Sequence, residues 1–111
     1  MNVLFICSKN EWRSRTAETI FRHDDRFAVK SAGTSRAARI RVRQQLINWA
    51  DHIFVMEHHH KERLAELFGD DLLGKPLVVL DIPDEYTYMD EELIQELRDV
   101  VEGWWQASGF R

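Results

Sequence analysis

The chain has few of the residues that build crosslinked, fibrous or membrane proteins. Its 111 residues include one cysteine, two prolines and five glycines. One cysteine excludes an internal disulfide framework, and so little glycine and proline excludes a collagen-like or low-complexity chain. No segment has the roughly 20 consecutive apolar residues of a membrane helix, and the short apolar run near the N-terminus does not look like a signal sequence. We therefore expect a cytoplasmic protein without a membrane partner.

The composition predicts one compact domain spanning residues 1–111. Hydrophobic residues make up 44% of the chain, which is enough to form a single core at this size. The net charge of −4 is unevenly distributed, with +6 in residues 1–50 and −10 in residues 51–111. A basic half of this kind indicates that the N-terminal half handles an anion, and a solvated surface is the alternative interpretation.

Strand and helix patterns alternate along the chain. Strands are predicted at 2–7, 26–33, 51–56 and 75–81, and helices at 13–24, 37–50, 59–69 and 90–105. In the second helix we expect Ile40, Val42 and Ile47 to point inward, and in the last helix we expect the tryptophans to join the core. This alternation predicts an α/β fold. We expect one three-layer domain, with a four-stranded parallel sheet in the order 2-1-3-4 and helices on both faces.

The segment "CSKNEWRS", residues 7–14, lies between the first predicted strand and the first predicted helix. The free N–H groups at the helix N-terminus attract a phosphate-like anion, and the same field, with Arg13, favours the nucleophilic thiolate of Cys7. The planar guanidinium of Arg13 suits two phosphoryl oxygens. Ser14 can donate to the sulfur, and Asn10 tolerates the left-handed conformation that a tight loop needs. An inert buried thiol is the alternative reading of Cys7.

Four segments together resemble the low-molecular-weight protein tyrosine phosphatase family, whose phosphate loop is C-x5-R-S after the first strand. "NVLFICSKNEWRSRTAE" resembles the family's opening, "SAGT" the end of its second strand, "ADHIFVME" its aspartate-plus-strand segment, and "DIPDEY" the region of its general acid. They occur in the family's order and cover nearly the whole chain. The resemblance is therefore more specific than the loop alone.

The resemblance implies a hydrolase that forms a cysteinyl-phosphate intermediate and needs no metal or cofactor. Cys7 is then the nucleophile, Arg13 the phosphate ligand and Asp84 the general acid; a turn or helix-capping role is the alternative for Asp84. The other residues expected at the substrate site are Ser8, Lys9, Asn10, Glu11, Trp12, Ser14 and Tyr86. The implied partner is a phosphorylated substrate, either a protein phosphotyrosine or a small phosphomonoester.

The chain also departs from the family pattern. The segment between "SAGT" and "ADHIFVME" is shorter than usual, and within the loop Glu11 and Trp12 replace the family's apolar residue and second cysteine. The expected general acid is followed by Glu85 instead of proline. We therefore expect a substrate preference different from that of a generic phosphotyrosine phosphatase, with Trp12, Tyr86 and Tyr88 available to stack a flat leaving group.

Three other functions compete with this interpretation. The first is a phosphatase of nucleotides or nucleic-acid ends, with Arg36, Arg39, Arg41 and Arg43 as a steering patch; a solvated helix face is the plainer reading of these arginines. The second is a regulatory module that binds phosphate without turnover. The third, arsenate reduction, normally uses several cysteines of one chain and is excluded by the single cysteine.

The run His58–His60 suggests a metal site, but adjacent helical residues do not face one another. We expect surface histidines at the start of a helix. The sequence does not predict the oligomeric state.

Overall fold

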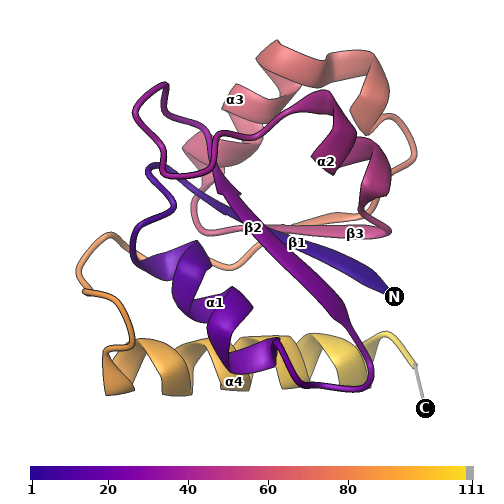
Figure 1. The fold of residues 1–111 in the computed structure, drawn as a ribbon. Coiled ribbons are helices and arrows are strands. Elements are labelled where there is room, and N and C mark those ends of the chain that lie inside the picture. Colours follow the sequence, from indigo (N-terminus) through magenta and orange to yellow (C-terminus); the bar gives the residue numbers. More distant parts are fainter. Residues whose placement is uncertain (110–111) are drawn as a thin grey trace.

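The computed structural model describes residues 1–109, and it shows a parallel sheet between two layers of helices (Figure 1). The strands are β1 (Asn2–Cys7), β2 (Ala28–Gly33), β3 (His52–Val55) and β4 (Leu77–Val79). All pairings are parallel, and the strand order is β2-β1-β3-β4. The predicted α/β class, strand order and parallel sheet are confirmed.

The helices cover both faces of the sheet. They are α1 (Arg13–Phe21), α2 (Gln44–Trp49), α3 (His58–Phe68) and α4 (Glu91–Ala107), and a short 3-10 helix, Gly69–Leu72, follows α3. Figure 1 shows α1 and α4 on one face and α2 and α3 on the other. Within residues 1–109, no helix combines the length and the apolar character required to span a bilayer.

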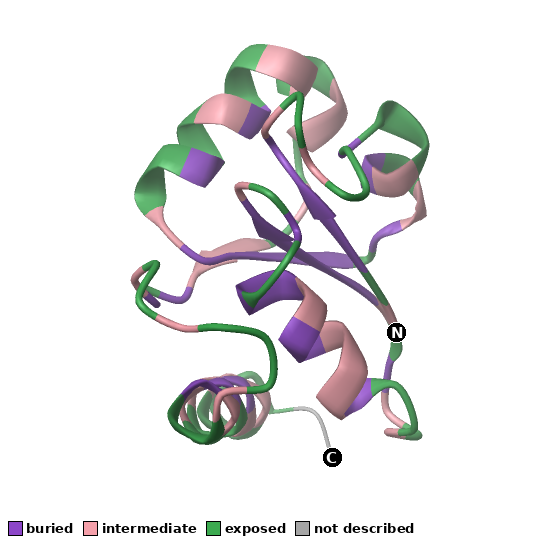
Figure 2. Ribbon diagram, turned by 60° about the vertical axis from the view of Figure 1, so that its left-hand side comes forward, coloured by how far each residue is buried: buried purple, intermediate pink, exposed green. Residues whose placement is uncertain are grey.

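The burial pattern of β1 explains why this strand lies at the centre. Successive side chains of a strand point to opposite faces, so an apolar run can fill two cores at once. Val3 and Phe5 pack toward α1 and α4, whereas Leu4 and Ile6 pack toward α2 and α3. Figure 2 shows buried residues along the strands and the inner helix faces, with exposed residues on the outer faces and connecting loops. Trp104 and Trp105 pack against the first core, as expected.

The predicted helix over 37–50 is wrong in its first half. The helix α2 begins only at Gln44, and the segment before it runs beside the end of β2, with an isolated parallel bridge between Gly33 and Arg41. Gly33 donates to the carbonyl of Ile40, and Val42 donates to the carbonyl of Gly33, so these peptide groups bond to the sheet edge and not to a helix. Ile40 is consequently exposed, whereas Val42 and Ile47 are buried as expected.

Candidate active site

The loop between β1 and α1 contains a left-handed residue and leads into a helix N-terminus that no side chain caps. The strand ends at Cys7 and the helix begins at Arg13. Asn10 has a φ of 57°, the left-handed conformation expected for it. No side chain caps the first turn of α1, so the N–H groups there remain available to an anion.

Gly33, the last residue of β2, lies directly behind this loop. A Cβ atom at this position would be 2.3 Å from the carbonyl oxygen of Ser8 and 3.0 Å from the backbone nitrogen of Asn10. Both distances are too short for ordinary contacts, so the loop packs against bare backbone. The shape of the loop therefore depends on the absence of a side chain at residue 33.

A chain of buried hydrogen bonds lies under the thiol. The Sγ atom of Cys7 is 2.9 Å from the Oγ atom of Ser14. The side-chain amide of Asn10 donates to Ser14 at 2.7 Å and to Ser31 at 2.9 Å, and Ser31 donates to Glu18 at 2.8 Å. Because Ser14 accepts from Asn10, its own proton can point to the sulfur. Ser14 is thus placed to donate a hydrogen bond to the sulfur of Cys7.

Arg13 is buried, and its guanidinium is held by partners from outside the loop. Its Nη1 donates to the carboxylate of Glu57 and, at 2.8 Å, to the carbonyl of Ile82. Its Nε is 3.8 Å from the Oδ1 of Asp84. Burial alone would raise the pKa of Glu57, but the hydrogen bond and charge of Arg13, together with His59, outweigh it and hold this pKa below its usual value. The guanidinium is thus fixed by a carboxylate that stays ionised.

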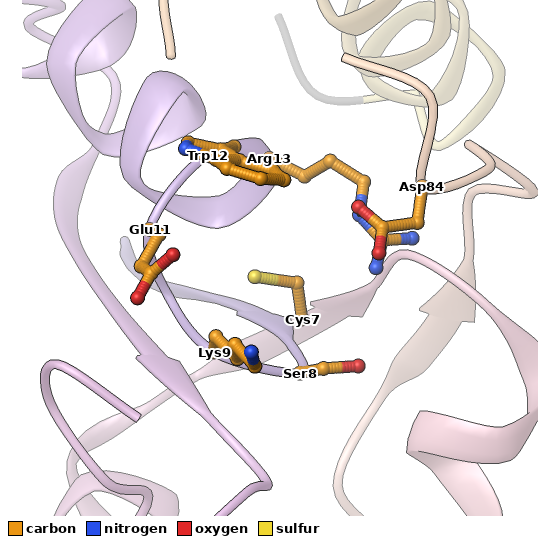
Figure 3. Close-up of a pocket in the computed structure, with 7 residues that line it drawn as sticks. All are labelled: Cys7, Ser8, Lys9, Glu11, Trp12, Arg13 and Asp84. Atoms are coloured by element: carbon orange, nitrogen blue, oxygen red, sulfur yellow. The ribbon is translucent and has the colours of Figure 1, made fainter. Parts of the chain in front are cut away.

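One pocket of about 130 Å³ collects most of the expected site residues (Figure 3). It is lined by Cys7, Ser8, Lys9, Glu11, Trp12, Arg13 and Asp84. In Figure 3 the thiol lies between Arg13 and Asp84 on one side and Lys9 and Glu11 on the other. The structure therefore brings six residues of the segment 7–13 together with Asp84, which is about seventy positions away in the chain.

Three other expected residues lie outside the pocket lining. Asn10 and Ser14 are fully buried beneath the loop, where they support it. Tyr86 packs toward α4, and its hydroxyl donates to Glu96 at 2.9 Å. Asn10 and Ser14 thus support the loop from below, whereas Tyr86 points toward α4 and not into the pocket.

The arginines that follow β2 do not form a helix face. Arg39 donates its backbone N–H to the carbonyl of Lys9 at 2.9 Å and its Nε to the carbonyl of Asn10 at 3.1 Å. Ser35 likewise donates to the carbonyl of Ser8 at 2.9 Å. Figure 1 shows this segment beside the loop that follows β1. Arg39 therefore supports the candidate phosphate loop.

Comparison with known proteins agrees with this architecture. No family model and no curated protein matches the sequence. Among solved structures, the low-molecular-weight protein tyrosine phosphatase of Streptococcus pyogenes has a TM-score of 0.77 at 20% identity, over 96% of this chain and 91% of that one. The tyrosine phosphatase Wzb of Escherichia coli K30, in complex with phosphate, has a TM-score of 0.74 at 23% identity, over 96% of each chain. The arginine phosphatase YwlE of Geobacillus stearothermophilus has a TM-score of 0.70 at 19% identity, over 96% and 94%.

The chain has the low-molecular-weight protein tyrosine phosphatase fold. The fold that the sequence resemblance implied is thereby confirmed. Within this phosphatase fold, the pocket lies where the loop after β1 meets the N-terminus of α1, at the carboxyl edge of the parallel sheet.

Two residues near the pocket of this phosphatase fold were missed by sequence reasoning. Glu57 follows β3 and binds Arg13, and His60, on the first turn of α3, is 2.8 Å from the Oγ of Ser8. The expectation of surface histidines is wrong for His60, which is fully buried, and holds for the exposed His58 and His59. The sequence contained a signal for the burial of His60, because His60 lies four positions before the apolar Leu64 and therefore on the same helix face.

Glu57, His59 and His60 form the one group within residues 1–109 whose ligand atoms lie close enough to hold a metal, all within 4.8 Å of one another. The groups already have partners, however. Glu57 binds Arg13, and both ring nitrogens of His60 make hydrogen bonds. A metal ion there would have to break the contacts that hold the loop, so the donor set does not fit a resident metal.

Proposed function

We propose that this protein is a cysteine-dependent phosphomonoester hydrolase. The observation that carries the proposal is the pocket in which the thiol of Cys7, the guanidinium of Arg13 and the carboxyl group of Asp84 meet at a helix N-terminus. A nucleophile, an anion ligand and an acid at one small cavity are the components of phosphoryl transfer through a covalent intermediate.

The reaction has two steps. In the first, the thiolate of Cys7 attacks phosphorus, the bond to the ester oxygen breaks, and Asp84 gives its proton to the departing oxygen. In the second, the Asp84 carboxylate takes a proton from water, the water oxygen attacks phosphorus, and the bond to sulfur breaks. The products are inorganic phosphate, the regenerated thiolate and protonated Asp84, which closes the cycle. Ser14 stabilises the sulfur as the leaving group through the 2.9 Å contact.

Asp84 is better placed for this role than its neighbour Asp81. Asp84 lines the pocket beside Arg13, with its side chain 60% exposed and open to substrate and water. Asp81 instead lies 3.6 Å from His58 and lines a different surface hollow. Arg13, fixed by Glu57, would contact the phosphoryl oxygens from bound ester to transition state.

The proposal is tested by turnover of p-nitrophenyl phosphate. We expect Cys7→Ser to abolish turnover while the protein keeps its unfolding midpoint, because the substitution removes the nucleophile from an otherwise intact loop. The control is His23→Gln, which is remote from the pocket and should remain fully active. Ser8→Gly cannot serve as a control, because Ser8 lies in the loop. Full activity in Cys7→Ser would show that Cys7 is not the nucleophile. Phosphate binding by the native protein without turnover would replace this proposal with a module that only binds phosphate.

A second candidate substrate is favoured by Glu11, whose exposed side chain lines the pocket. A carboxylate beside the phosphate repels an acidic leaving group and attracts a cationic one, such as the guanidinium of phosphoarginine, whereas a neutral leaving group gains no such attraction. The likeness to the arginine phosphatase YwlE supports the same class. An exposed pair contributes at most about 1 kcal/mol. Glu11→Gln should therefore lower kcat/KM for phosphoarginine by up to about fivefold and leave it equal or higher for phosphotyrosine; the opposite ranking favours the aryl ester.

A further inference from the structure

We infer that His60 is a positioning residue that holds the two ends of the phosphate loop in register, through Ser8 at one end and, with Glu57, Arg13 at the other. The inference rests on the proposed function. It concerns a side chain that touches neither the thiol nor the pocket.

His60 is buried at the junction of the helix α3 with the loop. It is the third residue of α3, in the first turn after β3 ends. Its side chain is fully inaccessible to solvent, although both preceding histidines are exposed. A buried imidazole must satisfy both ring nitrogens within the protein, and His60 does so with partners from two different segments.

The hydrogen bonds determine which nitrogen carries the proton. Nδ1 lies 3.1 Å from the backbone nitrogen of Glu57, which can only donate, so Nδ1 is the acceptor. The proton of the neutral ring is therefore on Nε2, which donates to the Oγ of Ser8 at 2.8 Å. Burial, helped by the charges of His59 and Arg13, lowers the pKa of His60 to about 3, so the ring keeps this form near neutral pH. Ser8 is thus held as an acceptor.

Glu57 connects the same imidazole to the arginine. Its side chain accepts the backbone N–H of His60 while its backbone N–H donates to the His60 ring, a reciprocal cap at the start of α3. The Glu57 carboxylate also accepts from Nη1 of Arg13. One pair of residues therefore reaches both the residue that follows the nucleophile and the arginine that ends the loop. A shift of His60 would change the place of Arg13 relative to Cys7.

Two substitutions separate the link to Ser8 from the helix cap. Asparagine at residue 60 can place its Oδ1 near the position of Nδ1, so it can keep the cap, but it is too short to reach Ser8. Ser8→Ala removes the other half of the same link and leaves the cap intact. We expect His60→Asn and Ser8→Ala each to lower kcat for p-nitrophenyl phosphate about tenfold, with KM changed less than about threefold, because small misplacements act mainly on the transition state.

The double variant supplies the decisive measurement. If both residues act through one hydrogen bond, His60→Asn with Ser8→Ala should lose about tenfold in kcat, as each single variant does, and not about a hundredfold. His60→Gln, whose longer amide can still donate to Ser8, should recover most of the lost kcat. His58→Asn removes an exposed imidazole from the same turn and should keep full activity.

Anion binding distinguishes failure of this inference from failure of the proposed function. Vanadate imitates the five-coordinate transition state, and inorganic phosphate imitates the product; both are titrated calorimetrically without turnover. We expect Ser8→Ala and His60→Asn to weaken vanadate binding about tenfold and phosphate binding less than about threefold. A native protein without turnover overturns the proposed function, and the vanadate ratio still tests the positioning role. Unchanged vanadate binding and unchanged kcat in Ser8→Ala overturn the inference, as do multiplicative losses in the double variant.

Discussion

Asn10 combines a left-handed backbone with two buried hydrogen bonds, and two substitutions separate these contributions. Asn10→Gly keeps the backbone free to adopt a φ of 57° but removes the amide that donates to Ser14 and Ser31. Asn10→Ala removes the same amide and also forces a Cβ-bearing residue without local hydrogen bonds into the left-handed region. The two variants therefore differ mainly in backbone strain.

The expected free energies follow from the contacts. Each buried hydrogen bond contributes about 0.5 to 1.5 kcal/mol, so Asn10→Gly should lower the free energy of unfolding by about 1 to 3 kcal/mol. A left-handed residue with a Cβ atom costs about 1 to 2 kcal/mol. This strain exceeds the entropic advantage of alanine over glycine in the unfolded chain, so Asn10→Ala should be the less stable of the two.

The assay is urea denaturation of both variants, together with turnover of p-nitrophenyl phosphate. Met89 provides a matched control because it has a φ of 61° and an exposed side chain, so Met89→Gly and Met89→Ala isolate the backbone effect. The Ala-to-Gly difference should have the same sign at both positions. If Asn10→Ala is as stable as Asn10→Gly while the pair at Met89 differs, the left-handed turn is not the reason for asparagine at this position.

Two further predictions concern His52 and Asp84. His52 is buried against Phe54, and desolvation lowers its pKa from 6.5 to about 4. The unfolded chain then binds the proton more tightly, so stability is complete above pH 6.5 and should fall by about 3 kcal/mol as the pH drops to about 4. Urea melts across this range should show a smaller loss for His52→Phe, and an equal loss would contradict the assignment. Asp84→Asn should lower kcat about a hundredfold for phenyl phosphate and less for p-nitrophenyl phosphate, with Asp81→Asn near native; the reverse order would transfer the acid role to Asp81.

Local patterns were sufficient to predict the framework of the fold. The apolar run of β1 and the alternation of strands and helices predicted a parallel sheet with helices on both faces, which the structure has. The loop was recognised because Cys7, Asn10 and Arg13 lie within one short segment at a strand-to-helix junction. Each of these inferences depends on residues close together in sequence, where backbone geometry limits the arrangements available.

The supports of the loop were harder to predict because they come from distant segments. Glu57 is 44 positions from Arg13, and His60 is 52 positions from Ser8. The segment around Arg39 was assigned to a helix, although arginine and apolar residues alternate from 39 to 43, a period of two that is typical of extended chain. The hydrogen bonds from Arg39 to the loop could not be inferred from this alternation alone.

The contact of the loop with the backbone of Gly33 means that the shape of the loop depends on residues outside the loop sequence. A methyl group there would also lie 2.7 Å from the Cβ of Ala38, so it would wedge apart three stretches of chain at once. A peptide containing only residues 7–14 would therefore lack the neighbouring segments that hold the loop in its conformation. Grafting the loop onto another scaffold would require copying the end of β2 and the segment that returns across it, and not the phosphate-loop sequence alone.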